Sequence, residues 1–174
     1  TTSAWLYQTE AQNDPHLVET GKTFFDLVMS LDRAQVEYDL GCEEIIGRHG
    51  SLTLRPAESP GSPARLTVGQ CDYSVVVIPP GTENLNKKTA DLLFAYLAAG
   101  GTVLCCGEPP ARIDGITSET GKALAGLSSW KRAEITTLPA TLLAATASGF
   151  AIHRAEQDKG ILFHHRRQVN DGEF

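Results

Sequence analysis

The clearest hydrophobic pattern of the chain lies between residues 72 and 110. Residues 73–78 (YSVVVI) are rich in β-branched side chains and are followed by two prolines, which is typical of a strand buried on both faces. In residues 89–99 the apolar positions recur at helical spacing, and two glycines then provide a helix stop. Residues 102–106 (TVLCC) form a second short apolar run. Two buried strands joined by a helix predict a βαβ unit of a parallel sheet.

A long helix is predicted before this unit. Asp14 and Pro15 are a typical helix cap and first helical residue, and apolar residues then recur at helical spacing to about Arg33. Residues 36–40 (VEYDL) alternate between apolar and polar and therefore predict a strand. Residues 42–46 predict one helical turn, which Gly47 closes.

A small β insertion is predicted over about residues 51–68. Residues 51–54 and 65–68 are short strand-like pieces, and the loop between them contains three prolines and a glycine. They predict a hairpin inserted on the main sheet. This leaves the central βαβ unit as the core of the domain.

The elements after the central unit continue the alternation of strand and helix. Residues 108–115 predict a loop that leaves the carboxyl end of a strand. Residues 117–127 predict a helix capped by Thr117, and residues 133–137 an edge strand. Residues 139–147 are rich in Ala and Leu and predict a further helix, with Gly149 as its stop.

The last 25 residues have a different character. Residues 150–157 and 161–168 flank the tripeptide DKG and predict a β-hairpin, and another turn at 170–172 leads into the first residues of a further strand. We therefore divide the chain into an α/β domain at 1–149 and, at 150–174, a β-hairpin with the start of a truncated β domain. Residues 4–7 are open to two interpretations. They either form a short strand, the first of the α/β domain, or are an aromatic segment over the carboxyl edge of the sheet, in which case the first strand of the domain is missing.

Composition narrows the class of protein. The 174 residues suffice for one domain with a core, and the net charge of −6 without a basic stripe argues against nucleic acid as the main partner. No apolar run approaches the roughly 20 residues that span a bilayer, so no membrane segment is predicted. The chain begins at Thr1 with no signal peptide, which indicates a mature product or an excised fragment.

Cysteine chemistry centres on Cys106. It follows the second strand of the central unit, where a nucleophile would stand, but the glycine two residues before it that a nucleophile elbow requires is missing. No histidine with an acidic neighbour follows a central strand. The four cysteines, expected to be buried or half-buried, also lack metal-ligand spacing, and no nucleotide-binding glycine motif occurs. We therefore expect no catalytic residue, no metal and no cofactor, with a thiol hydrolase using Cys106 as the alternative.

Polar and aromatic residues are expected at the carboxyl edge of the sheet, where α/β proteins bind ligands. Trp5 and Tyr7 could stack on a sugar, with Glu108 and Arg112 as further substrate-binding candidates from the loop at 108–115. Packed aromatic side chains are the simpler interpretation of the first two. Four carboxylates could also meet at this edge, although helix caps and loop hydrogen bonds are the favoured explanation of them: Asp39, Glu83, Glu108 and Asp114.

Several segments together resemble a known family. They are residues 72–80 (DYSVVVIPP), 99–103 (AGGTV) and 107–110 (GEPP), with residues 161–167 (ILFHHRR) followed by 171–174 (DGEF) in the tail. This combination resembles the class I glutamine-amidotransferase-like (flavodoxin-like) domain of large bacterial glycoside hydrolases. The similarity is to the α-L-rhamnosidase type and, more distantly, to the β-galactosidase trimerisation domain.

The resemblance implies a three-layer, mostly parallel α/β fold that lacks Cys-His-Glu chemistry. It implies a non-catalytic accessory domain of a periplasmic or extracellular enzyme, whose glycosidic carboxylates lie in a separate upstream barrel. The partners would be other domains of the parent chain, with carbohydrate or a second copy as further candidates. A stand-alone thiol hydrolase and a sugar-binding module remain the alternatives.

Overall fold

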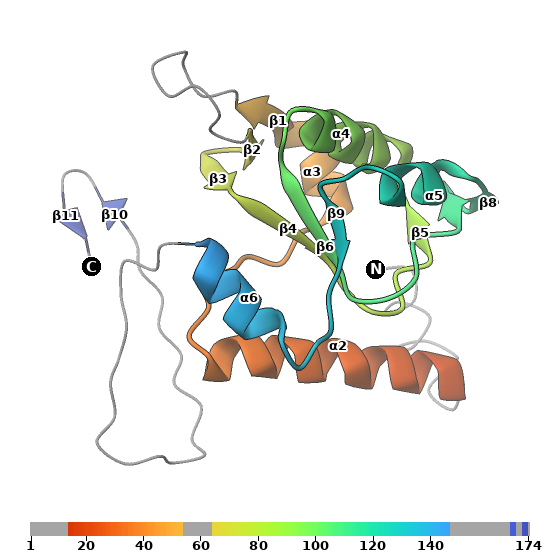
Figure 1. Ribbon diagram of the computed structural model, residues 1–174, viewed down its shortest axis with the longest axis horizontal. Coiled ribbons are helices and arrows are strands. Elements are labelled where there is room, and N and C mark those ends of the chain that lie inside the picture. The colour runs from red at the N-terminus through yellow and green to blue at the C-terminus, as the bar shows by residue number, and fades with distance from the viewer. Residues whose placement is uncertain (1–13, 54–63, 147–167, 170–171, 174) are drawn as a thin grey trace.

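The computed structural model describes residues 14–53, 64–146, 168–169 and 172–173. Within these residues the chain has a mixed α/β fold with parallel and antiparallel sheets. The parallel sheet has the strand order β4-β6-β9 and is formed by β4 (Val75–Ile78), β6 (Thr102–Cys105) and β9 (Trp130–Arg132). Figure 1 shows this sheet at the centre of the described residues.

The central βαβ unit is confirmed. β4 and β6 pair in parallel, with Val75 opposite Thr102 and Ile78 opposite Cys105, and α4 (Lys87–Ala98) connects them. The helix ends where the glycine pair predicts, because Gly100 adopts a φ of +85°.

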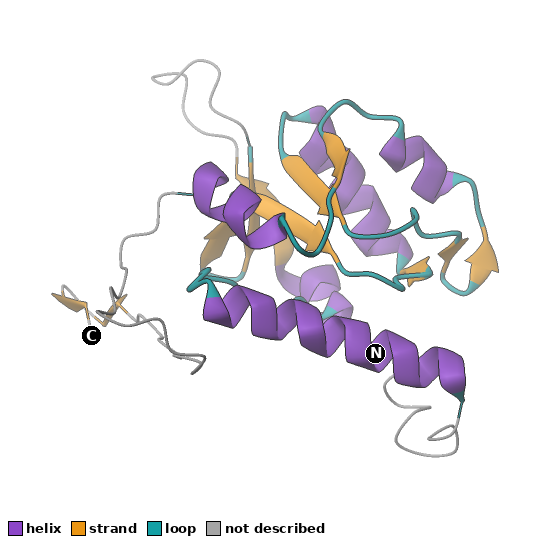
Figure 2. Ribbon diagram, turned by 60° about the horizontal axis from the view of Figure 1, so that its bottom comes forward, coloured by secondary structure: helices purple, strands orange, loops and turns teal. Residues whose placement is uncertain are grey.

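Helices cover both sides of this sheet (Figure 2). On one side α2 (Pro15–Arg33) and α6 (Leu138–Ala145) pack against Leu104, Val75 and Val77. On the other side lie α4 and α5 (Thr120–Ala125), around Val103 and Cys105. α2 begins as predicted, since the Asp14 carboxylate accepts hydrogen bonds from the backbone N–H groups of the first helical turn.

A second, antiparallel sheet adjoins the first. It has the order β1-β2-β3 and contains β1 (Gly50–Thr53), β2 (Arg65–Val68) and β3 (Cys71–Tyr73). The predicted hairpin is confirmed, but the predicted single strand over 73–78 is divided at Ser74. The carbonyl of Ser74, at this break, accepts a hydrogen bond from the Tyr96 hydroxyl at 2.8 Å. A side chain of α4 is therefore its hydrogen-bond partner.

The loop predicted over 108–115 contains strand structure. β5 (Asn84–Leu85) pairs in parallel with β7 (Arg112–Ile113), which pairs with β8 (Ile116–Thr117) across a two-residue turn. Asp114 and Gly115 both have positive φ, as the Asp-Gly hairpin turn requires. Because β8 uses residue 117, the predicted helix start there is wrong, and α5 begins at Thr120.

Two other predicted strands are corrected. In the described part of the chain, residues 36–40 are assigned neither strand nor helix. Val36 packs against α2, and its N–H closes the helix end by donating to the Leu31 carbonyl. The alternation of apolar and polar residues there therefore reflects burial against a helix and not pairing in a sheet. The edge strand predicted at 133–137 lies earlier, as β9, because the Glu134 carbonyl accepts from the N–H groups of Thr137 and Leu138 and turns the chain into α6.

The remaining predictions differ only in extent or lie outside the described residues. The helical turn at 42–46 is α3 (Glu43–His49), with Gly47 inside the helix rather than at its end. The hairpin over 150–168 and the stop at 149 fall outside the described residues, apart from β10 (Gln168–Val169), which pairs antiparallel with β11 (Gly172–Glu173). Among the described helices none is long and apolar enough to cross a membrane.

Candidate functional site

The candidate site is the carboxyl edge of the parallel sheet. β4, β6 and β9 end there side by side, and the segments at 79–83, 106–111 and 133–137 leave from their ends. α2 begins at the same edge, because His16 Nε2 lies 3.0 Å from Glu83 Oε1. A nucleophile or ligand of this fold class would be expected at this edge.

The two adjacent cysteines point to opposite faces of the sheet, as a strand requires. Cys105 is buried in the cluster beneath α4 and α5, whereas Cys106 packs with the cluster beneath α2 and α6. Cys105 Sγ donates a weak hydrogen bond to the Gly107 carbonyl at 3.4 Å. All four cysteines are free, and Cys71 is exposed, which corrects the expectation that all four are at least half-buried.

Neither thiol at this edge is activated. Burial raises the pKa of Cys105. Burial, with smaller contributions from Cys105 and Glu134, raises the pKa of Cys106 to about 11. A catalytic thiol needs the opposite shift, produced by a nearby cation or helix N-terminus. In the described part of the chain the histidines are His16, which faces Glu83, and His49 at the end of α3, so no hydrogen bond links an imidazole to Cys106.

Cys106 is therefore expected to alkylate slowly. With a pKa of about 11, only on the order of one thiol in a thousand is ionised at pH 8. Exposed Cys71 provides the internal control. Timed iodoacetamide labelling followed by peptide mass spectrometry should show Cys71 modified well before Cys106. If Cys106 were modified before Cys71, the prediction that the Cys106 thiol is inert would be contradicted.

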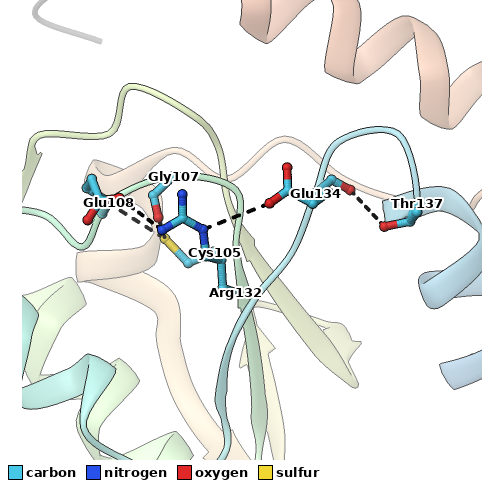
Figure 3. Close-up of polar contacts among 6 residues, drawn as sticks. All are labelled: Cys105, Gly107, Glu108, Arg132, Glu134 and Thr137. Carbon is cyan, nitrogen blue, oxygen red and sulfur yellow. Dashed lines mark hydrogen bonds and ion pairs between the residues drawn. The ribbon is translucent and has the colours of Figure 1, made fainter.

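An arginine joins two carboxylates at this edge (Figure 3). Arg132 Nη1 lies 3.0 Å from Glu108 Oε1, and Arg132 Nε lies 3.9 Å from Glu134 Oε1. The Glu134 carbonyl also accepts from the Thr137 hydroxyl at 3.3 Å. All three charged side chains are at least two-thirds exposed, so each ion pair contributes at most about 1 kcal/mol to stability.

The four carboxylates do not meet. Glu108 pairs with Arg132 and Glu83 with His16, whereas Asp39 accepts from the Tyr73 hydroxyl at 2.7 Å. Asp114 accepts from the backbone N–H of Lys87 at 2.9 Å and thereby caps α4. Helix capping and loop hydrogen bonding explain their positions, and among the described residues no group of three metal-ligating side chains occurs.

A polar cleft of about 430 Å³ lies between α3 and the start of α4. A helix N-terminus in a cleft is a ready anion site, but here the chain's own carboxylates occupy it. The Asn86 N–H donates to Glu43 at 2.7 Å, and the Lys87 N–H donates to Asp114. The sequence signal for this arrangement is the Asp-Gly turn, which places Asp114 beside α4.

The predicted substrate-binding residues have mixed outcomes. Trp5 and Tyr7 lie outside the described residues. Glu108 lies at the carboxyl edge with an exposed side chain. Arg112 is exposed as well, but it belongs to β7 and its guanidinium donates to the Gly115 carbonyl at 3.2 Å. Arg132 and Glu134 complete the edge and were not predicted as site residues, because the strand was expected three residues later.

Comparisons with protein-family models, with curated proteins and with solved structures found no match to this chain. The chemistry of the site is therefore inferred from its geometry alone. Two buried or half-buried thiols with raised pKa values lie beside an exposed Glu-Arg-Glu series, which can donate and accept hydrogen bonds at an open surface.

The raised pKa values also predict a loss of stability in alkali. Burial raises the pKa of Tyr38 to about 12 and that of Cys106 to about 11, above the ordinary values of 10.0 and 9.0. The folded state thus holds protons that the unfolded state releases. Their contribution to stability is complete below about pH 9 and is lost as the pH rises towards 12. Urea unfolding at pH 8, 9, 10 and 11 should show this decline. A double variant with Cys106→Ala and Tyr38→Phe should make it shallower, and the raised pKa values of Cys105 and Tyr96 should account for the decline that remains.

Proposed function

We propose that this chain is a non-catalytic accessory domain of a bacterial glycoside hydrolase, with the three-layer flavodoxin-like fold of class I glutamine amidotransferases. Its partners are the other domains of the parent polypeptide and other copies of it, and the parent is periplasmic or extracellular. One observation carries the proposal. Cys106 stands where the amidotransferase fold would hold its nucleophile, but its thiol is half-buried with a raised pKa.

The positions of the resembling segments support the proposal. The two prolines at 79–80 follow β4, the glycine pair at 100–101 precedes β6, and Gly107 with Glu108 follows it. Each segment therefore occupies a junction of the βαβ unit, where a motif constrains the path of the backbone. The helices on both sides of the β4-β6-β9 sheet agree with a layered α/β domain.

The test uses the full-length enzyme. Its complete coding sequence should contain an upstream barrel domain with paired acidic residues and a downstream β-sandwich. Cys106→Ala should leave kcat for an aryl glycoside unchanged, whereas replacing either barrel carboxylate by the amide should reduce it by orders of magnitude. A complete coding sequence without a barrel, or loss of activity in Cys106→Ala alone, would contradict the proposal.

The loops of this domain also form part of the substrate-cleft wall in this proposal. Glu108 supports it, because its exposed carboxylate, although paired with Arg132 through Oε1, can also accept hydrogen bonds from sugar hydroxyls. We expect Trp5→Ala and Glu108→Ala to raise KM for an oligosaccharide several-fold with little change in kcat. Phe25→Ala, an exposed aromatic on α2, is the matched control. An unchanged KM in both variants would exclude the proposal that this domain forms part of the substrate-cleft wall.

A further inference from the structure

A chemically reactive dipeptide forms the turn between β7 and β8. Asp114 is followed directly by Gly115, and both residues are exposed to water. Glycine has no side chain to shield its backbone nitrogen, so this nitrogen can attack the carboxyl carbon of the residue before it. The turn is therefore a candidate for spontaneous rearrangement of the backbone.

The rearrangement has two steps and needs no reactant other than water. First, the Gly115 nitrogen forms a bond to Cγ of the protonated Asp114 carboxyl group. One carboxyl oxygen leaves as water, with the proton of the acid and the proton of the amide, and a five-membered succinimide ring remains. Water then adds to the main-chain carbonyl carbon of the ring and breaks its bond to nitrogen. The product is isoaspartate, in which the backbone runs through the former side chain.

Both reacting groups are held by neighbouring elements in the folded chain. Asp114 Oδ1 accepts a hydrogen bond from the backbone N–H of Lys87, at the start of α4, at 2.9 Å. The Gly115 N–H donates to Asn84 Oδ1, in β5, at 2.7 Å. Ring closure moves the Gly115 nitrogen and the Asp114 carboxyl group together and away from these partners. The two hydrogen bonds therefore slow the reaction.

The product does not fit this turn. Ile113 lies opposite Ile116 across two residues of positive φ, and the Asp114 N–H donates to the Leu85 carbonyl at 3.0 Å. Isoaspartate adds one carbon to the backbone of the turn and moves the carboxylate to a new position. The hairpin register and the hydrogen bond to Lys87 are then lost, so α4 loses its cap.

We propose that Asp114 is a modification site, which converts to isoaspartate when the turn opens, and that Asn84 restrains this conversion in the folded chain. The conversion uncaps α4 and changes the polar cleft between α3 and α4, because Asp114 lines that cleft. The proposal does not depend on the glycoside hydrolase assignment.

Ageing of the full chain at neutral pH tests the proposal. Peptide mapping by mass spectrometry measures isoaspartate at residue 114 and separates it from the Asp-Gly pair at 171–172. We expect the folded chain to form it at least about tenfold more slowly than the same chain in guanidinium chloride, because two hydrogen bonds must open. Asn84→Ala removes one of these bonds and should raise the rate in the folded chain roughly two- to tenfold.

Two references accompany this variant. Asn86→Ala is the matched control, because within the described residues the Asn86 side chain makes no capping hydrogen bond. The Val103 amide, in β6, reports on opening of the whole domain through its hydrogen exchange. In the separated isoaspartate form the Lys87 amide should exchange faster than in the parent chain, and an unchanged amide would contradict the loss of the cap.

Four further outcomes would overturn the proposal. If isoaspartate does not form at residue 114 even in denaturant, the site is unreactive. If the folded and denatured chains react at the same rate, the two hydrogen bonds do not restrain the turn. If Asn84→Ala reacts no faster than the parent or than Asn86→Ala, Asn84 is not the restraint. If the Val103 amide in Asn84→Ala exchanges faster by the same factor, unfolding of the domain is the cause.

Discussion

Replacing Gly121 by alanine is expected to destabilise the domain by about 3 kcal/mol, because the new methyl group has no space. Gly121 is buried in the first turn of α5, and a Cβ there would overlap the carbonyl oxygen of Pro110. That oxygen belongs to the backbone, so a side-chain rotation cannot relieve the overlap. Either α5 or the segment after β6 must move.

Gly21→Ala is the matched control. Gly21 is also a helical glycine, but a Cβ there would meet nothing within 4 Å. Alanine has the higher helix propensity, so this variant should be more stable by roughly 0.5–1 kcal/mol. Urea unfolding of both variants followed by circular dichroism gives the free energies of unfolding. Equal effects of the two substitutions would show that helix propensity, and not the contact with Pro110, decides the result.

The Gly121→Ala variant also links stability to the candidate site. Pro110 lies on the segment that carries Glu108 from the end of β6. If that segment moves, the ion pair between Glu108 and Arg132 should be lost. The Arg132 Nε–H resonance in an NMR spectrum would report its loss, and the variant Glu108→Gln gives the reference shift. An unchanged resonance in Gly121→Ala would place the displacement in α5 instead.

The central βαβ unit could be predicted because each of its signals is local. The apolar runs, the period of α4 and the stop at Gly100 each act within a few residues, and the structure confirms them. The split at Ser74 could not be predicted in this way, because the Tyr96 hydroxyl that bonds to the Ser74 carbonyl at the break is 22 residues away.

The strand predictions at 36–40 and 133–137 were wrong for a related reason. Alternation reports which side chains are buried, and Val36 is buried in the cluster with α2 although residues 36–40 form no strand in the described part of the chain. At 133–137 the pattern continued past β9, where hydrogen bonds to the Glu134 carbonyl end the extended conformation. The Asp-Gly turn at 114–115 is the opposite case, since the Asp-Gly pair is itself a local hairpin signal, which the structure bears out with two positive φ angles.

The candidate site was predicted at the level of the sheet edge but not of its residues. Cys106 was correctly placed at a strand end, and its raised pKa depends on burial that a linear sequence does not report. Arg132 was missed because its partner Glu108 is 24 residues away and the register of β9 was not known. The pairing of charges at an open edge depends on tertiary structure, so the pattern of a single strand cannot reveal it.

Truncating Tyr96 should have the largest effect of any single substitution considered. Its side chain is fully buried beneath α4, and its hydroxyl donates to the Ser74 carbonyl where the two sheets join. Tyr96→Ala removes a large aromatic group from the core, which costs about 3–5 kcal/mol, and also leaves the Ser74 carbonyl without its partner. Tyr96→Phe keeps the ring, so it isolates the hydrogen bond and should cost about 1 kcal/mol.

The difference between these variants tests how the two sheets are joined. Phe94→Ala, in the same helix but with a side chain about half exposed, is the control and should cost less than the core cavity of Tyr96→Ala. Hydrogen exchange should show that Tyr96→Phe weakens protection at β3 and the start of β4 more than at β9, because the lost bond lies at Ser74. A uniform loss of protection across the sheets would instead indicate that Tyr96 contributes only bulk to the core and that the junction at Ser74 holds without it.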